Sequence, residues 1–250
     1  MARSTTGGLK RAMFIGCSHG HLANPILLQE ALAFAEEFRP HHRVHLGDAF
    51  DMACFRSGAS GSNDEGGNID EDLHCGIKFV KEYRPTLFMF GNHEDRLVSL
   101  SNHPRDIIAS AAKFALTNLE AVFDSIKCEM VHYGTIADLR SWRLFGDTAV
   151  GHGYLFGENC TRDTVEMLGY NVIHAHDHKA KIQPGRVSRG LMGYSVGTLA
   201  EIPAMSYAKA RRATSAWSAG IVYGEFKEGM SRWHLKLLNG GQRAEIKAVV

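Results

Sequence analysis

Apolar and polar positions near the start of the chain follow the order strand, helix, strand. Residues 12–16 form a short apolar run that predicts a strand. Residues 25–38 carry apolar side chains at helical spacing, and Pro25 is suited to the first turn of a helix. Residues 44–46, with Val44 and Leu46 on either side of a histidine, predict a second strand. This order is typical of a βαβ unit, in which the two strands are parallel.

The same order recurs in the next stretch of the chain. Residues 57–68 are rich in glycine, serine and asparagine and predict a flexible loop, which is either a lid over the site or simply disordered. Residues 69–83 predict a helix, and residues 86–90 predict a third strand. We therefore expect several parallel strands joined by helices.

The second half of the chain has a different pattern. Residues 105–126 predict one or two helices. Short strand-like runs follow, at 142–145, 148–150, 171–174, 191–194, 220–226 and 232–238. A turn at 226–231, around Gly229, separates the last two runs, so this half indicates a mixed sheet rich in hairpins. We expect an α/β fold, a four-layer αββα sandwich of two mixed β-sheets flanked by helices.

Composition narrows the class of protein. A chain of 250 residues with 44% hydrophobic side chains favours a single domain over residues 1–250, with residues 1–10 as a flexible N-terminus and 240–250 as a C-terminal extension. Its apolar runs are far shorter than the about 20 residues of a membrane span, and its start lacks the apolar core of a signal peptide. Five widely spaced cysteines without a Cys-x-x-Cys pair favour a reducing compartment.

These observations predict a cytoplasmic protein without a membrane partner, and they leave its oligomeric state open. The net charge is +1 with neutral histidines, which supplies no global field for a polyanion. A nucleic acid would therefore need a local basic patch.

Five short segments carry side chains that ligate metals, and several of them come directly after a predicted strand. Residues at strand ends can converge from distant parts of a sequence, which two-metal hydrolysis requires. In order, the segments are Cys17-Ser18-His19, Gly47-Asp48, Gly91-Asn92-His93-Glu94, Gly151-His152 and Ala175-His176-Asp177-His178.

In this order the segments resemble the motifs of the calcineurin-like metallophosphoesterase superfamily. Those motifs are Asp-x-His, Gly-Asp-x-x-Asp, Gly-Asn-His-Asp/Glu, a lone His and Gly-His-x-His. The resemblance spans residues 17–178, and five motifs in order are far more specific than any one of them. The compact layout around residues 91–97 is similar to bacterial and bacteriophage members.

The resemblance implies two divalent metal ions. Cys17, His19, Asp48 and His178 would hold the first metal, and Asp48, Asn92, His152 and His176 the second. The shared Asp48 would keep the ions about 3.5 to 4 Å apart, so that a bridging hydroxide attacks the phosphorus. His93 would be the general acid for the leaving group, with its tautomer set by Glu94 or by a backbone carbonyl.

Cys17 departs from the superfamily pattern, which has aspartate at this position. As a thiolate ligand it would favour Fe or Zn at the first site over Mg or Mn, although Fe, Zn and Mn all suit the pair. The alternative is a small buried residue that weakens the site. The run Gly16-Cys17-Ser18-His19-Gly20 is similar to the start of RNA lariat debranching enzymes, but the chain lacks a counterpart of their long recognition insertion.

Further residues are candidates for substrate contact, each with a plainer alternative. Arg96 would grip a phosphate or would pair with Glu94 or Asp95 on the helix surface. Tyr154 would contact substrate or only pack. A basic segment would bind phosphates beside a stacking surface from Tyr207 or Trp217, or would be an exposed loop: Lys209, Arg211 and Arg212.

Two residues beside the motifs have open roles. Asp51 would orient a metal ligand or would be an acid at a helix N-terminus. His21 is expected to be a solvated loop residue and not a ligand.

The leading functional hypothesis is a metal-dependent phosphodiesterase acting on a nucleotide or nucleic acid. The alternative is a phosphomonoesterase for small molecules or proteins, although Asp51 is followed by Met52-Ala53 where protein phosphatases of the superfamily have Arg-Gly. A third hypothesis is a non-catalytic scaffold with the same fold. The scaffold is disfavoured because Asp48, Asn92 and His93 are all present together with the three later histidines.

Overall fold

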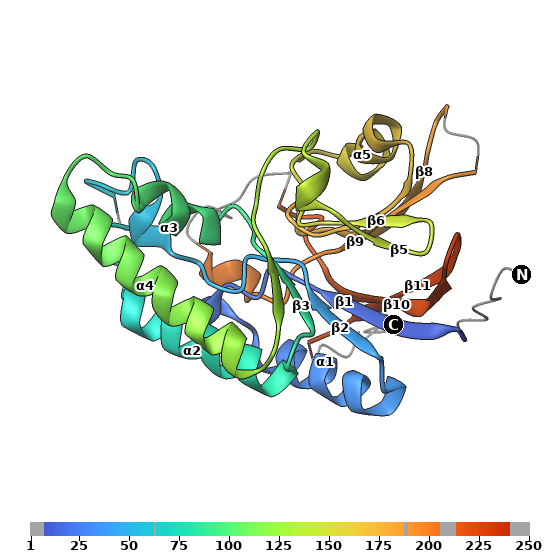
Figure 1. The fold of residues 1–250 in the computed structure, drawn as a ribbon, viewed down its shortest axis with the longest axis horizontal. Helices are drawn as coiled ribbons and strands as arrows, with labels where there is room; N and C mark the ends of the chain where they lie inside the picture. Colours follow the sequence, from blue (N-terminus) through green and yellow to red (C-terminus); the bar gives the residue numbers. More distant parts are fainter. Residues whose placement is uncertain (1–7, 63, 188–189, 206–213, 241–250) are drawn as a thin grey trace, which may run out of the picture.

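Two β-sheets pack face to face between layers of helices (Figure 1). The computed structural model describes residues 8–62, 64–187, 190–205 and 214–240. On one side of the pair, α1 (Pro25–Phe38), α2 (Ile69–Tyr83) and α4 (Asp106–Ser125) cover the first sheet. On the other side, α5 (Cys160–Leu168) covers the second sheet. This arrangement confirms the predicted four-layer sandwich.

The first sheet has six strands in the order β11-β10-β1-β2-β3-β4 within the described residues. Its strands β1 to β4 are parallel neighbours, as the βαβ pattern predicted, and β10 and β11 add an antiparallel hairpin at the β1 edge. The strand bounds are β1 (Lys10–Ile15), β2 (His42–His45), β3 (Leu87–Met89), β4 (Glu129–Val131), β10 (Ala219–Lys227) and β11 (Met230–Leu238).

The second sheet has five strands in the order β5-β6-β7-β9-β8, again within the described part of the chain. Strands β6, β7 and β9 are parallel, and the two edge strands run antiparallel to their neighbours. The bounds are β5 (Arg143–Phe145), β6 (Thr148–Val150), β7 (Asn171–His174), β8 (Ala180–Pro184) and β9 (Met192–Val196).

Side-chain alternation along β1 explains the layers. Ala12 and Phe14 face the second sheet and pack in one core with Val150 and Ile173. Met13, the alternate residue, faces the other way and packs against α1. Because neighbouring residues of a strand point to opposite faces, residues 12–15 of β1 are all apolar and are buried on both sides.

Asparagine side chains cap the starts of α1 and α2. Asn24 precedes α1 and accepts the backbone N–H groups of Ile26 and Leu27, while Pro25 occupies the first helical position. Asn68 precedes α2 and accepts the N–H of Glu71. Such caps satisfy donors that have no partner inside the helix.

Short helices complete the chain, and some elements were not predicted. The pattern of apolar positions did not delimit α3 (Glu94–Leu100), although the sequence placed Arg96 on a helix surface, and it missed the strands β4 and β8. Single turns of 3-10 helix are η1 (Gly20–Leu22), η2 (Ala53–Phe55), η3 (Leu139–Ser141) and η4 (Ile202–Ala204). In the part of the chain that is described, every helix is too short or too polar to cross a membrane.

Candidate metal centre

The predicted ligands lie where strands of both sheets end. Cys17 and His19 follow β1, Asp48 follows β2, and Asn92 follows β3. From the second sheet, His152 follows β6, and the loop after β7 carries two more: His176 and His178. The strands concerned are parallel within each sheet, so their carboxyl ends meet at one edge and bring distant segments together.

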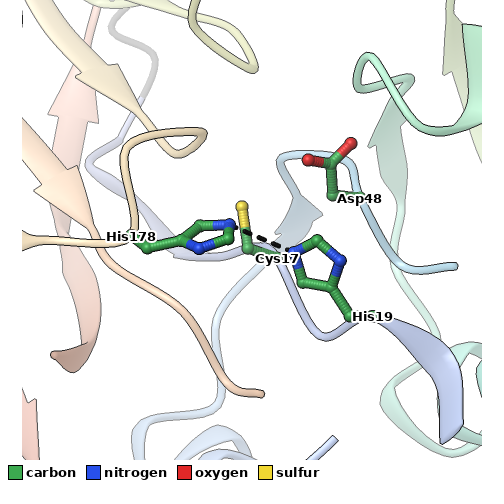
Figure 2. A group of neighbouring side chains, drawn as sticks. All are labelled: Cys17, His19, Asp48 and His178. Atoms are coloured by element: carbon green, nitrogen blue, oxygen red, sulfur yellow. Dashed lines mark hydrogen bonds between the residues drawn. The ribbon is translucent and has the colours of Figure 1, made fainter. Parts of the chain in front are cut away.

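The first predicted set forms a tight group, shown in Figure 2. Ligand atoms of Cys17, His19, Asp48 and His178 all lie within 4.8 Å of one another, and all four residues are buried. The Nε2 atoms of His19 and His178 are 3.1 Å apart and face each other.

The second predicted set forms a group beside the first. Ligand atoms of Asp48, His152 and His176 also lie within 4.8 Å of one another. The Asn92 Oδ1 atom is 3.1 Å from His152 Nε2 and 2.9 Å from His176 Nδ1, so the predicted amide belongs to this group as well. Asp48 is common to both groups, as a bridging carboxylate must be.

The hydrogen bonds of the histidines fit bound cations. His19 Nδ1 lies 2.9 Å from Asp51 Oδ1, which places the ring proton there and leaves a lone pair on Nε2. His152 Nδ1 donates to the Leu46 carbonyl at 2.6 Å, so its Nε2 lone pair faces the Asp48 carboxylate at 3.2 Å. His178 Nδ1 is buried without a hydrogen-bond partner. A metal cation held between these atoms would satisfy the facing nitrogen lone pairs and the carboxylate oxygens.

Burial and neighbouring charges shift the pKa values of the two acidic candidate ligands, Cys17 and Asp48. It raises the pKa of the Cys17 thiol well above the usual value, and the nearby Asp48 carboxylate raises it further. Burial also raises the pKa of Asp48, but His152 and His93 outweigh this effect and hold that pKa well below the usual range. Cys17 would therefore become a thiolate only with a cation at this centre, whereas Asp48 is already ionised.

The backbone is strained at the same residues. Among the residues described, nine other than glycine have a positive φ angle, and five of these belong to the two groups: Cys17 (52°), His19 (54°), Asp48 (51°), His176 (70°) and His178 (59°). Each such conformation is unfavourable for a residue with a Cβ and persists only where the surroundings enforce it. The strained residues are therefore concentrated at this edge of the two sheets.

His93 lies against the group with its ring 4.7 Å from that of His19. Its Nδ1 bonds the Asp51 carbonyl, which leaves Nε2 directed toward Asp48 Oδ2 at 3.8 Å. The sequence suggested that either Glu94 or a backbone carbonyl sets the tautomer of His93. In the structure the Asp51 carbonyl does so, and the Glu94 carboxylate instead accepts backbone N–H groups of the loop after β2. Burial lowers the pKa of His93 to about 4, and Asp48 opposes that effect.

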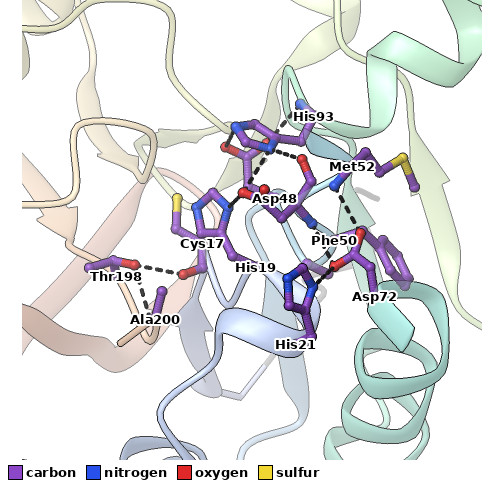
Figure 3. A network of polar contacts seen from close by, with 12 residues as sticks. Cys17, His19, His21, Asp48, Phe50, Met52, Asp72, His93, Thr198 and Ala200 are labelled. Carbon is purple, nitrogen blue, oxygen red and sulfur yellow. Dashed lines mark hydrogen bonds and ion pairs between the residues drawn. The ribbon is translucent and has the colours of Figure 1, made fainter. Parts of the chain in front are cut away.

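Two buried carboxylates, not predicted in this role, hold the loop after β2. Glu94 accepts the backbone N–H groups of Asp48, Ala49, Phe50 and Gly91. Asp72, from α2, accepts the N–H groups of Asp51 and Met52 and contacts His21 Nδ1 at 3.2 Å (Figure 3). His21 is exposed, as predicted, and its ring is also held by Asp72. No side-chain pattern marks these contacts in the sequence, because the donors are backbone groups.

The Asp51 side chain contacts the ring of His19 and lies outside any α-helix, which favours the interpretation as an orienting acid over that of an acid at a helix N-terminus. Burial raises the pKa of Asp51, but His19, His93 and Arg96 together outweigh this effect and lower that pKa below its usual value. An ionised Asp51 fixes the ring of His19 in the orientation that a metal ligand requires.

The predicted substrate contacts are more dispersed. Arg96 donates Nη1 to the carbonyls of Asp51 and Met52 at 2.8 and 3.1 Å, instead of pairing with Glu94 or Asp95. Tyr154 receives the Gly134 N–H, and its ring stacks on that of Tyr133. The Trp217 ring lies 4.5 Å from that of His178. Four predicted residues lie outside the described part of the chain: Tyr207, Lys209, Arg211 and Arg212.

Comparison with known proteins identifies the family. The model of the calcineurin-like phosphoesterase family matches residues 10–180. Among curated proteins, none matches this chain.

Solved structures of similar shape include a predicted phosphoesterase from Streptococcus pneumoniae, with 9% identity, a TM-score of 0.36, and coverage of 92% of this chain and 100% of the other. A phosphoesterase from E. coli has 13% identity and a TM-score of 0.38 at the same coverage. A 5'-nucleotidase precursor from Thermus thermophilus has 10% identity and a TM-score of 0.42 over 92% of this chain and 54% of its own.

Family membership rests on the sequence match, which covers both groups of side chains. The chain belongs to the calcineurin-like phosphoesterase family and is a metal-dependent phosphoester hydrolase.

Proposed function

We propose that the protein is a two-metal phosphodiesterase whose substrates are nucleotides or nucleic acids. The observation that carries this proposal is the position of Asp48, whose carboxylate belongs to both groups of side chains. The family uses divalent metal ions. The proposed ligands of the first ion are Cys17, His19, Asp48 and His178, and those of the second are Asp48, Asn92, His152 and His176.

The donor set suits an anionic substrate. When bound, two such cations activate water as a nucleophile and neutralise charge on the phosphoryl oxygens. The chain itself contributes one carboxylate, one thiol, one amide and four imidazoles to the two groups, so little negative charge opposes an approaching phosphoester. The thiol of Cys17 favours Fe or Zn at the first site.

His93 is the proposed proton donor. Its Nδ1 proton is held by the Asp51 carbonyl, so the ring presents Nε2 to the centre. A phosphoester anion beside Nε2 favours the imidazolium form, which places the transferable proton on the atom that faces the leaving oxygen.

The choice of a diester over a monoester rests on the cationic groups around the centre. A monoester brings a second negative charge, which arginine side chains usually neutralise. Arg96, the arginine next to the Asn92-His93 motif, uses Nη1 to hold the carbonyls of Asp51 and Met52. Met52 and Ala53 also stand where protein phosphatases of the superfamily carry an Arg-Gly pair. These features favour a singly charged diester.

Metal analysis combined with two model esters tests the proposal. Protein purified anaerobically without added metal is assayed for bound Fe, Zn and Mn, and then for hydrolysis of bis(4-nitrophenyl) phosphate and of 4-nitrophenyl phosphate. We expect about two metal equivalents, as a two-metal site requires, and a clear preference for the diester. Preference for the monoester would replace the diester assignment. Less than one equivalent and no hydrolysis after reconstitution would show a binding module instead of an enzyme.

A further inference from the structure

A buried polar network lies behind the loop that carries His176 and His178. Asp177 stands between these two histidines in sequence and is 6% exposed, with its side chain directed away from the centre. Its carboxylate receives side-chain donors from three elements, β8, β9 and the start of α5. These are Lys181 Nζ at 2.7 Å, Ser195 Oγ at 2.6 Å and Cys160 Sγ at 3.1 Å. We call these four residues the Asp177 network.

The loop needs such an anchor because its backbone is strained. His176 and His178 have φ angles of 70° and 59°, so Asp177 is flanked on both sides by left-handed residues. Backbone bonds restrain the loop only in part: His176 N–H reaches Cys17 Sγ at 3.3 Å, and the His178 carbonyl accepts the N–H of Ser218 at 2.9 Å. Strained conformations persist only where several contacts enforce them together.

The Asp177 network is not a further metal site, because a lysine of the chain already pairs with its carboxylate. Cys160, His174 and Asp177 lie close enough together to resemble a third ligand group. However, the Lys181 ammonium lies 2.7 Å from Asp177 and 3.3 Å from the Cys160 sulfur, so a cation from the chain already occupies the centre of the group. His174 Nε2 is bonded to the hydroxyl of Thr161 at 2.7 Å. The residues therefore serve as a structural clamp.

We propose that Asp177 is a positioning residue, which fixes the loop after β7 so that both of its histidines keep their imidazoles in the metal centre. The proposal rests on the proposed function, since it takes His176 and His178 as ligands of the two metal ions. One side chain would thereby set a ligand of each metal at once.

This role differs from that of Asp51, which contacts a ligand ring directly. Asp177 touches neither imidazole and acts through the backbone between them. Groups that orient metal ligands from behind usually change metal affinity by about 10- to 100-fold when they are removed. We therefore expect a loss of affinity at both sites on replacement of Asp177, with little change in the ligands themselves.

Binding of Co(II) alone to the metal-free protein tests the proposal, because its ligand-field absorption reports coordination without any turnover. Asp177→Ala should weaken Co(II) binding about 10- to 100-fold and alter the absorption bands. Ser195→Ala removes one hydrogen-bond donor to Asp177 and should weaken Co(II) binding less than Asp177→Ala does. This variant replaces Asp177→Ala in the test if the latter fails to fold. Asp147→Asn is the matched control, since Asp147 also accepts a serine hydroxyl, from Ser231, but precedes β6 at the end opposite His152.

A paired replacement separates positioning from stability. Removing both charges in Asp177→Asn/Lys181→Met avoids an unpaired buried ion, so stability should recover relative to Asp177→Asn alone. Metal affinity should stay low if Asp177 positions the loop. Recovery of affinity along with stability would overturn the proposal, as would Co(II) affinities within twofold of the parent in folded Asp177→Ala or Ser195→Ala. A parent that binds no Co(II) would instead overturn the proposed function, and this inference with it.

Discussion

The carboxylate of Glu94 lies under the loop of Asp48 and accepts the backbone N–H of that residue at 2.9 Å. The same carboxylate accepts the N–H groups of Ala49, Phe50 and Gly91, so it joins the loop after β2 to the loop after β3. The Asp48 carboxylate in turn accepts the backbone N–H of His93 at 3.0 Å. The two loops that carry the shared carboxylate and the proposed proton donor are therefore held in register by one buried side chain.

Replacing Glu94 with Gln should destabilise the protein by about 2–4 kcal/mol. An amide keeps one acceptor oxygen but places an NH2 group against backbone donors, which leaves buried N–H groups without acceptors at about 1–3 kcal/mol each. Urea unfolding measures the change. Glu82→Gln, at an exposed position of α2, is the matched control. A Glu94→Gln protein as stable as the control would show that these hydrogen bonds do not hold the loops together.

Replacing His93 with Asn should lower kcat by roughly 10² or more for diesters with poor leaving groups, because the proton donor is lost. The loss should be smaller for a nitrophenol leaving group, which departs without a proton. Metal content should stay near that of the parent, because His93 is not a proposed ligand. Equal activity of variant and parent on poorly leaving esters would remove His93 from the mechanism.

Replacing Asp48 with Asn should reduce occupancy of both metal sites. An amide offers one neutral oxygen where the carboxylate offers two charged ones, and Asp48 is the residue common to both groups. Metal content measured after dialysis should fall well below that of the parent. Loss of a single metal equivalent, with full occupancy of the other site, would contradict the bridging role.

Replacing Cys17 with Asp should shift metal preference toward Mn(II), because a carboxylate is a harder ligand than a thiolate. Competition between Zn(II) and Mn(II) for the metal-free protein measures the shift. Cys128→Ser provides a control at a buried cysteine that contacts the Glu129 carbonyl, away from both groups. If Cys17→Asp and the parent select the same metals, Cys17 is a buried spacer and not a ligand.

The sequence could predict which candidate ligands come together, because ligand chemistry resides in side-chain types that follow apolar strands. It could not predict the buried carboxylates whose hydrogen bonds hold the loops around the candidate metal centre. Glu94 and Asp72 bind backbone N–H groups of a loop whose shape depends on the tertiary structure. Asp177 meets Lys181 and Cys160 only after β8 and α5 have packed together.

The strands β4 and β8 were also not predicted, because both lie at the edge of a sheet and few of their residues are buried. β8 reads Ala-Lys-Ile-Gln-Pro and lies at the edge of its sheet. Within the described residues it pairs with β9 alone, and none of its five residues is buried. β4 has three residues, of which only Val131 is buried. Short edge strands need no continuous apolar pattern, because one neighbour and one covered face suffice.

His45, at the end of β2, should make stability depend on pH. Burial is the largest effect and lowers the pKa of His45 to about 3, although Asp48 opposes it. Its Nδ1 accepts the Gly47 N–H and its Nε2 contacts the Ser18 hydroxyl, an arrangement that needs the neutral ring. The unfolded chain has a histidine pKa of about 6.5 and binds more protons than the folded chain between these two values.

Stability should therefore be lost as pH falls below about 6.5, by up to roughly 2–3 kcal/mol from His45 alone at pH 4.5. Urea unfolding of metal-free parent and His45→Gln at several pH values measures this contribution as a difference in slope. Above pH 7.5 the ring is neutral in both states, so the two curves should run parallel there and provide the internal control. If the two curves also run parallel in the acid range, His45 has the same pKa in the folded and the unfolded protein, and the prediction is wrong.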